Sequence, residues 1–374
     1  MKCIRCQTDS KYKDRQGRRD CAKCGEKFAF EPKTDRWSVT DGMFKRAIDD
    51  VSSKGTLFFT ERQLYYEFSR RLIRKMPDKM RDGGIVLCVV STVASVVFTA
   101  ISGTLFPLIG GMCGVAGGVA IATSSRWRKA VTPIAPVAFV EFKSKYLNNW
   151  IDAHGEVEKL LAPAPRTTSG GTAIPSDFSA YSFDRALVTG SREIAAMLVA
   201  NRFHFENNCA ILSRDGYPEH VFDTVMSMLQ RNPNLTVFAV HGASYGGLLL
   251  AVQMREDHWF PDRTVRIIDL GLRPQHAIKL KLIGLQEATA VTDTTATARL
   301  TEEESKWLAN GYVVDLAALR PAKLMRAIYQ GFARATRDLS STSSGDDGIV
   351  IYSDSGGTWM NDPTADIYAS DSFG

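Results

Sequence analysis

A stretch of 43 residues without a charged side chain, residues 83–125, constrains the fold of this chain more than any other feature. The stretch is far longer than a buried core helix needs. A T-L-F-P sequence at 104–107 divides it into two apolar segments, 84–103 and 108–124, and each is close to the length of one membrane span. We therefore expect a two-helix transmembrane hairpin over 83–125. A glycine-rich hairpin buried within a soluble protein is the alternative.

Basic residues flank this stretch on both sides and predict its orientation. They are Arg74, Lys75, Lys79 and Arg81 before it, and Arg126, Arg128 and Lys129 after it. Because positive residues concentrate on the cytoplasmic side of a membrane, we expect a hairpin in the cell membrane with both flanking domains cytoplasmic. The chain starts M-K-C-I-R-C, which lacks the apolar segment of a cleavable signal peptide. Gly110, Gly114 and Gly118 recur every fourth residue, a spacing that lets membrane helices pack closely.

Residues 1–32 contain two C-x-x-C pairs, with fourteen residues between the pairs. The pairs are Cys3 with Cys6 and Cys21 with Cys24. Each pair can present two thiolates from one tight turn, and four thiolates suit the tetrahedral coordination of zinc. Residues 1–32 are therefore predicted to be a zinc ribbon around one structural Zn(II). Redox chemistry is less favoured, because a redox C-x-x-C would follow a strand of a βαβ unit and would need no second pair.

The remaining segments outside the main domain are predicted to be helical, linking or unstructured. Residues 37–82 and the connector 126–161 are expected to be mainly helical, with one helix over 146–161. Residues 162–180 are rich in Pro, Gly, Ser and Thr and predict a linker. In the last segment, 337–374, the residues from Asp338 onward include seven aspartates and no Lys or Arg, and they are too poor in apolar residues to fold alone. A disordered acidic tail is expected there, so the folded part is more basic than the net charge of +5.

Residues 181–336 alternate between strand-like and helix-like patterns. Strands are expected at 185–190, 209–213, 236–240 and 265–270. Helices are expected up to residue 201 and at 219–231, 248–255 and 301–334. This alternation predicts an α/β domain with a parallel sheet.

Several motifs in this domain resemble a known family. A-I-L-S-R-D-G-Y-P-E at 210–219 is followed by V-F-A-V, by the turn H-G-A-S-Y-G-G at 241–247, and later by I-I-D-L-G-L-R-P and V-V-D-L-A-A-L-R-P-A-K-L. In order and spacing they resemble the Toprim domain of the topoisomerase VI A subunit, whose family includes the transesterase that makes meiotic double-strand breaks. Upstream, F-F-T-E-R-Q-L-Y-Y resembles the family's winged-helix motif. The resemblance implies a winged-helix-like segment at 37–82 and a Toprim-like sheet at 181–336.

The chemistry of that family assigns roles to two residues of the winged-helix-like segment. In the family, a tyrosine attacks a DNA phosphate while Toprim carboxylates hold a divalent metal that offsets the developing charge. The matching tyrosine is Tyr66. Arg62 lies four residues earlier, so on a helix the two side chains would share a face and position a phosphate.

The carboxylates that would hold the metal are missing from this sequence. The family's glutamate position falls on Gly190, and its D-x-D falls on His241, Gly242 and Ala243. The retained motif residues are Gly216, Tyr217, Pro218, Tyr245 and Gly246. Binding of Mg(II) is therefore not expected, because its usual oxygen ligands are absent. The alternative is a displaced metal site built from neighbouring acids: Glu193, Asp215, Glu219 and Asp223.

The turn after the third strand also fits a different class of enzyme. Gly242 to Gly246 match G-x-S-x-G with Ser244 at the nucleophile position of an α/β-hydrolase. Asp269 and His276 follow, but they are only seven residues apart, whereas separate loops normally supply the acid and the histidine. The hydrolase using Ser244 is therefore a weaker hypothesis.

Taken together, the sequence predicts a membrane-tethered relative of the topoisomerase VI A subunit with an added zinc ribbon and a degenerate metal site. The expected function is DNA binding without cleavage, as a scaffold in genome defence or chromosome handling. The family resemblance implies a homodimer and a GHKL-type ATPase subunit as partners. The alternatives are an active tyrosine DNA transesterase and a protein-interaction platform without a DNA role.

Overall fold

The computed structural model describes residues 1–9, 11, 13, 18–75, 132–164, 183–218, 235–256, 265–287, 300–341 and 349–351. The predicted transmembrane hairpin at 83–125 lies outside these ranges, as does most of the predicted linker at 162–180. Within the described ranges, no helix is both long enough and apolar enough to cross a membrane.

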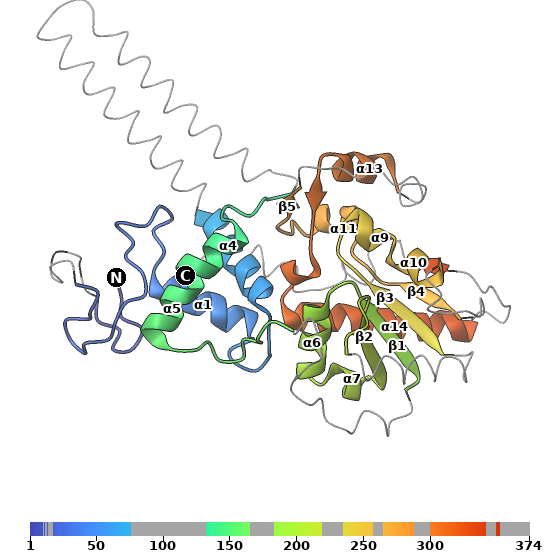
Figure 1. Ribbon diagram of the computed structural model, residues 1–374, viewed down its shortest axis with the longest axis horizontal. Helices are drawn as coiled ribbons and strands as arrows, with labels where there is room; N and C mark the ends of the chain where they lie inside the picture. Colours follow the sequence, from blue (N-terminus) through green and yellow to red (C-terminus); the bar gives the residue numbers. More distant parts are fainter. Residues whose placement is uncertain are drawn as a thin grey trace, which may run out of the picture.

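A helical unit follows the cysteine-rich N-terminal region (Figure 1). It contains α1 (Asp41–Val51), a helix over residues 61–75, and a continuous helix made of α4 (Phe139–Glu141), the π-helical turn η1 (Phe142–Leu147) and α5 (Asn148–His154). These helices meet in a core of buried aromatic rings, formed by Phe30, Phe44, Phe68, Phe142, Tyr146 and Trp150. Tilted pairs dominate this core, with the ring centroids of Phe68 and Tyr146 4.8 Å apart. These large apolar rings in contact form the core of the helical unit.

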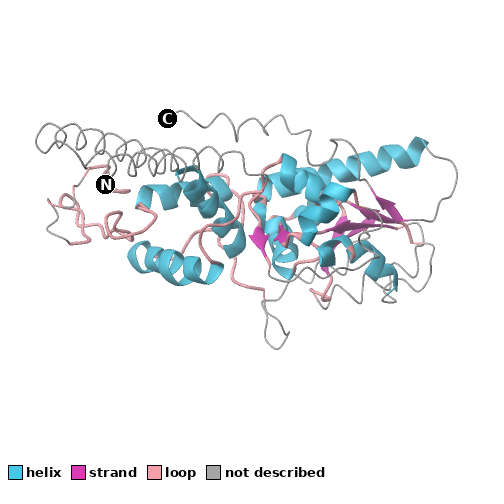
Figure 2. Ribbon diagram, turned by 90° about the horizontal axis from the view of Figure 1, so that it is seen from above, coloured by secondary structure: helices cyan, strands magenta, loops and turns pink. Residues whose placement is uncertain are grey.

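The second unit is an α/β domain around a parallel sheet with the strand order β2-β1-β3-β4-β7 (Figures 1 and 2). The strands are β1 (Arg185–Thr189), β2 (Cys209–Ser213), β3 (Thr236–Val240), β4 (Ile267–Asp269) and β7 (Ile349–Ile351). The described helices and helical turns of the domain are α6 (Arg192–Ala200), α7 (Phe203–Glu206), α9 (Tyr245–Leu248), α10 (Leu250–Glu256), α11 (Pro274–Lys279), α13 (Glu302–Ala309), η3 (Leu316–Ala318) and α14 (Pro321–Ser341). A separate antiparallel pair joins β5 (Leu285–Gln286) to β6 (Tyr312–Val313).

Successive strand residues point to opposite sides of the sheet, and helices cover both of its faces. On one face, Leu187, Ile211 and Phe238 pack with residues of α6 and α14. On the other face, Ala186 and Val237 belong to a second cluster with residues of α10. The first cluster also includes the aromatic core of the helical unit. One hydrophobic core therefore extends from the sheet into the helical unit.

The predicted α/β character of this domain is confirmed. The four strands expected from the sequence are present, and they pair in parallel. In the described part of the winged-helix-like segment, 37–75, the structure contains two helices, Asp41–Val51 and residues 61–75, joined by turns, and one β-bridge between Phe59 and Leu160.

Three local predictions are corrected by the structure. The helix expected over 146–161 spans Phe139 to His154, because Gly155 at φ +83° ends it. The helix expected over 301–334 is interrupted by β6 and η3 between α13 and α14. The tail expected to be unstructured over 337–374 instead begins with the end of α14, and its residues 349–351 form β7 beside β4.

Candidate functional site

The four N-terminal cysteines lie close enough together to hold a metal ion. Their ligand atoms are all within 4.8 Å of one another, with 3.7 Å between Sγ of Cys3 and Cys24 and 3.6 Å between Sγ of Cys6 and Cys21. Four thiolates bound to zinc at about 2.3 Å in a tetrahedron would be about 3.8 Å apart, so the donor set fits that ion. Within the described ranges, no other group of three or more His, Cys, Asp or Glu side chains converges in this way.

Hydrogen bonds to Asp41 connect the cysteine-rich region to the helical unit. Its buried carboxylate accepts hydrogen bonds from the backbone N–H groups of Ala29 (3.0 Å) and Phe30 (3.1 Å). It also lies 2.8 Å from Nε2 of His154 at the end of α5. Burial works to lower the pKa of His154, but its bonds to Asp41 and Glu26 outweigh burial and raise the pKa. His154 therefore links Glu26 of the cysteine-rich region to Asp41 of α1 and to α5.

The positions that match the family's metal ligands lie along one edge of the sheet. Gly190 follows β1, and His241, Gly242 and Ala243 follow β3, its hydrogen-bonded neighbour. The carboxyl ends of parallel strands meet at one edge, so these positions are brought together as the resemblance implies. An acid at the same edge is Asp269, the last residue of β4, which is in register with Ala239 of β3, two residues before His241.

His241 and Asp269 form a buried pair at this edge. Nε2 of His241 lies 3.0 Å from Oδ1 of Asp269, and Nδ1 lies 2.8 Å from the carbonyl oxygen of Gly242. Both partners are acceptors, so the geometry favours a ring whose two nitrogens both donate, which is the imidazolium form. Burial works to lower the pKa of His241, but the Asp269 carboxylate outweighs it and raises the pKa. Burial works to raise the pKa of Asp269, but His241 outweighs it and lowers the pKa.

The His241 ring packs closely against the backbone at Gly271 and Gly247. A Cβ at Gly271 would lie 2.1 Å from Nε2 of His241, and a Cβ at Gly247 would lie 3.1 Å from Nδ1. Gly242 is equally confined, because its Cβ would lie 2.4 Å from the carbonyl oxygen of Val314. The His241 residue is 1% exposed. With both nitrogens protonated and the ring enclosed, His241 offers no lone pair to a metal ion.

Tyr66, the predicted nucleophile, is enclosed between the two units. Its residue is 1% exposed, and its hydroxyl has no hydrogen-bond partner among the described residues. Burial and then the nearby Asp315 carboxylate raise the pKa of Tyr66. In this conformation the hydroxyl is hidden from a DNA phosphate and hard to ionise, so it is poorly placed for attack.

Arg62, the predicted partner of Tyr66, contacts the α/β domain. Its guanidinium lies 3.8 Å from a carboxylate oxygen of Glu193 at the start of α6, and 3.8 Å from one of Asp315. It also lies over the ring of Phe139, 5.0 Å from the centroid. Arg62 therefore bridges the helical unit and the α/β domain.

The retained motif residues form two turns beside the sheet edge. Gly216, Tyr217 and Pro218 follow β2, and Gly216 has φ +77°, a conformation that favours glycine. Tyr245 and Gly246 open α9 after the turn that contains Gly242. None of these five retained residues carries a carboxylate.

The acids of the alternative, displaced metal site do not converge in the described structure. Asp215 accepts a hydrogen bond from Nε of Arg192 at 2.8 Å, and Glu193 faces Arg62. Glu219 and Asp223 lie outside the described residues. The two described acids are therefore engaged by arginines.

The candidate hydrolase residues are also separated by their partners. The Ser244 hydroxyl accepts a hydrogen bond from the backbone N–H of Gly247 at 3.1 Å and caps α9. Asp269 pairs with His241, whereas Nδ1 of His276 accepts a hydrogen bond from the backbone N–H of Arg273 at 3.1 Å. Burial and then Arg273 lower the pKa of His276 to about 4. The described contacts therefore do not assemble a Ser-His-Asp relay.

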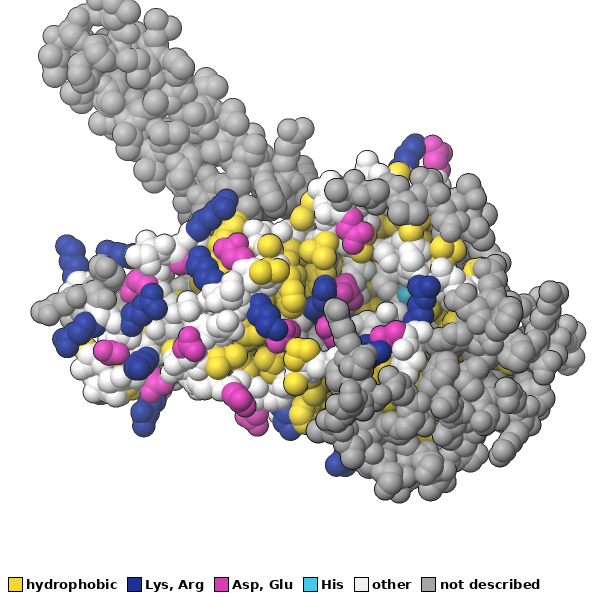
Figure 3. Space-filling view, in the orientation of Figure 1, with side chains coloured by type: hydrophobic (Ala, Val, Ile, Leu, Met, Phe, Trp, Pro, Cys, Tyr) yellow, Lys and Arg dark blue, Asp and Glu magenta, His cyan; other side chains and the backbone are white. Residues whose placement is uncertain are grey.

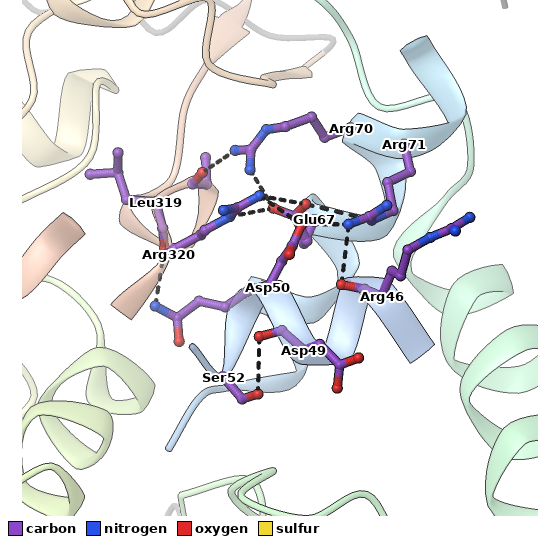
Figure 4. Close-up of polar contacts among 11 residues, drawn as sticks. Arg46, Asp49, Asp50, Ser52, Glu67, Arg70, Arg71, Leu319 and Arg320 are labelled. Atoms are coloured by element: carbon purple, nitrogen blue, oxygen red, sulfur yellow. Dashed lines mark hydrogen bonds and ion pairs between the residues drawn. The ribbon is translucent and has the colours of Figure 1, made fainter. Parts of the chain in front are cut away.

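A buried charge network, which the sequence analysis missed, lies between the helical unit and the segment before α14 (Figure 4). The guanidinium groups of Arg70, Arg71 and Arg320 converge on the carboxylate of Glu67, whose side chain is 2% exposed. Arg320 donates to both Glu67 oxygens at 2.9 Å, and Arg71 and Arg320 also contact Asp50 of α1. Burial works to raise the pKa of Glu67, but Arg70 and Arg320 outweigh it and bring the pKa to about 2.

Backbone carbonyls strengthen this connection between the units. Nε2 of Gln63 donates to the carbonyl of Leu319 at 3.1 Å, and Arg70 donates to the carbonyl of Ala318 at 3.0 Å. The helix over 61–75 is therefore tied directly to η3 and to the start of α14.

Further basic side chains extend the network to the surface. Arg46 and Arg74 are exposed on the helical unit, and in Figure 4 the Arg46 side chain points away from Glu67. Burial and then the positive charge of Arg70 lower the pKa of Arg74, as expected where like charges are crowded. Lys323 and Arg326 follow Arg320 at three-residue spacing on α14. We call this set of basic residues the basic junction: Arg46, Arg70, Arg71, Arg74, Arg320, Lys323 and Arg326.

The basic junction has a signal in the sequence. R-R-L-I-R-K at 70–75 and R-P-A-K-L-M-R at 320–326 both place bases three or four residues apart, which gives one basic helical face each. Figure 3 shows one face of the molecule, where Lys and Arg side chains also gather over the end that carries the cysteine-rich region.

No protein-family model matches the chain, and no curated protein sequence matches it.

Proposed function

We propose that this chain is a membrane-anchored, topoisomerase VI A-like protein that binds DNA without cutting it, as a scaffold in genome defence or chromosome handling. In this proposal the four cysteines hold a structural Zn(II), residues 83–125 form the anchor, and the two flanking parts share the cytoplasm. A homodimer and a GHKL-type ATPase partner belong to the same proposal through the family resemblance.

The absence of cleavage rests on the His241–Asp269 pair. Metal-assisted phosphoryl chemistry needs carboxylates that are free to bind Mg(II) and a site open to substrate. At the corresponding edge, Asp269 is already neutralised by an enclosed imidazolium. The burial of Tyr66 supports the same conclusion from the other unit.

DNA binding is supported by the basic junction, because phosphate contacts by Arg and Lys dominate sequence-independent affinity for DNA. Guanidinium groups also match phosphate oxygens bidentately. Glu67 and Asp50 neutralise part of this charge and hold the inner arginines in position. The exposed Arg46, Arg74 and Arg326 remain at the surface.

A titration of labelled duplex DNA with the full-length chain in mild detergent tests binding. We expect sequence-independent binding at 50 mM salt that weakens steeply by 200 mM. Arg74→Ala and Arg326→Ala should each weaken binding and reduce the slope of log affinity against log salt by about one, if each contacts one phosphate. Lys306→Ala on α13 removes an exposed charge outside the basic junction and is the matched control. Absence of binding at 50 mM salt would favour the protein-interaction platform.

A second experiment tests the absence of cleavage. Incubation with supercoiled DNA and Mg(II) or Mn(II), followed by denaturation, would trap a covalent phosphotyrosine adduct. We expect none. An adduct that disappears in Tyr66→Phe would establish an active transesterase. Fractionation with and without residues 83–125 tests the anchor, since only the shortened chain should leave the membrane pellet.

A further inference from the structure

The basic junction opens onto the carboxyl edge of the sheet. Val314 pairs with Ala243 directly after β3, so the chain is at this edge shortly before α14 begins. From there α14 crosses the sheet face, with the ring of Phe332 4.5 Å from that of Phe238 in β3 and under the guanidinium of Arg185 at the start of β1. The first turns of α14, with Lys323 and Arg326, therefore lie toward the carboxyl edge.

The C-terminal tail leaves the sheet at the same edge. β7 is parallel to β4, and its last residue, Ile351, is in register with Asp269 at the carboxyl end of β4. The 23 residues that follow can span up to roughly 75 Å when extended, so length does not prevent contact with the start of α14.

The composition of this tail complements the basic junction. Residues 352–374 contain four aspartates, no Lys or Arg, and four aromatic residues spaced between the acids. They are Tyr352, Asp354, Trp359, Asp362, Asp366, Tyr368, Asp371 and Phe373. Carboxylates pair with guanidinium groups, and aromatic rings stack on them, so both side-chain types suit an arginine-rich surface. A nucleic acid can make the same two kinds of contact, because its phosphates pair with guanidinium groups and its bases stack on them.

We propose that residues 352–374 dock on the basic junction and compete there with DNA. The docking itself stands on the charge and topology of this chain, whereas the competition rests on the proposed DNA-binding function. A tethered segment has an effective concentration of the order of millimolar, so weak contacts suffice to occupy the surface. DNA must then displace the tail, which lowers the apparent affinity of the full-length chain.

A labelled peptide of residues 352–374 tests docking without DNA. We expect it to bind the chain ending at residue 351, which keeps β7, and to bind the full-length chain at least tenfold more weakly, because the resident tail competes. Arg74→Glu with Arg326→Glu should weaken peptide binding at least tenfold, and Lys306→Glu should not. A peptide with its four aspartates changed to asparagine leaves the protein untouched and should not bind. Equal binding of both peptides, or equal binding to both chains, would overturn the proposal.

The two proposals fail in distinguishable ways. DNA should bind the chain ending at residue 351 at least tenfold more tightly than the full-length chain at 50 mM salt. If DNA binds both chains equally and the peptide does not bind, the docking is wrong while the DNA-binding function stands. If the peptide binds as described and neither chain binds DNA, the docking stands and the competition with DNA is wrong.

Discussion

Replacing His241 with glutamine tests whether the charged pair at the sheet edge stabilises the domain. The amide can still donate one hydrogen bond, but it removes the positive charge that faces Asp269. Breaking a buried ion pair by removing one partner costs about 3–5 kcal/mol. Whole domains are stabilised by only about 5–15 kcal/mol, so His241→Gln should destabilise β3 and β4 severely.

The pair also predicts a pH dependence. The folded pKa of His241 is raised, so its contribution is complete below the unfolded pKa of about 6.5 and is lost as pH rises through the folded pKa. The folded pKa of Asp269 is lowered, so its contribution is present above about 3.9 and is lost as pH falls through the folded pKa. Stability from the pair should therefore be greatest between about pH 4 and 6.5.

Hydrogen exchange of peptides that cover β3 and β4 measures this local stability without assuming that all units unfold together. His241→Gln should speed their exchange by roughly 10²- to 10⁴-fold at pH 6 and remove the loss of protection that the wild type shows as pH rises above about 6.5, after correction for intrinsic rates. His276→Gln is the matched control, because His276 is buried but its lowered pKa of about 4 keeps it neutral over that range. A wild-type pH slope retained in His241→Gln would show that the ring is not an imidazolium.

Two further predictions concern the other buried centres. Freshly reduced protein should contain one zinc per chain, and a chelator should unfold the cysteine-rich region. The reason is that the core of this region, Cys3, Cys21 and Phe28, is too small to fold it without the metal. Metal analysis that finds no zinc would refute this prediction. Glu67→Gln should loosen the helical unit from α14 and speed exchange over residues 61–75. Because the folded pKa of Glu67 is about 2, its contribution is complete above about pH 4.5 and lost as pH falls toward 2, and the variant should lack that loss.

The strands of the domain were predictable because each is short, apolar and bounded by turn residues. β7 was not predictable in the same way, because I-V-I stands within a sequence dominated by Ser, Gly and Asp. Its strand conformation depends on pairing with β4, about eighty residues earlier in the chain. Local pattern cannot reveal such a partner, so the composition of 337–374 predicted disorder.

The candidate site was predictable in position but not in chemistry. Spacing placed Gly190 and His241 at one edge, since Gly190 ends one predicted strand and His241 directly follows another. To predict the pairing of His241 with Asp269, one must know that β3 and β4 are neighbours in the sheet. To predict the charged ring, one must also know that the carbonyl of Gly242 is the acceptor for its second nitrogen. Glu67 gave no local signal at all, because its burial depends on Arg320, more than 250 residues away in the chain.

The two charged centres differ in a way that bears on the choice between enzyme and scaffold. At the sheet edge, the buried His241 ring faces the Asp269 carboxylate and packs against Gly271, so this centre is enclosed and its charges are paired. At the basic junction, Glu67 anchors the inner arginines, while Arg46, Arg74 and Arg326 reach the surface. A reaction on phosphate needs an open site at the first centre, whereas binding of a polyanion needs surface charge at the second. This difference between the two centres supports the proposed scaffold, and it makes the basic junction the first place to introduce mutations that should weaken DNA binding.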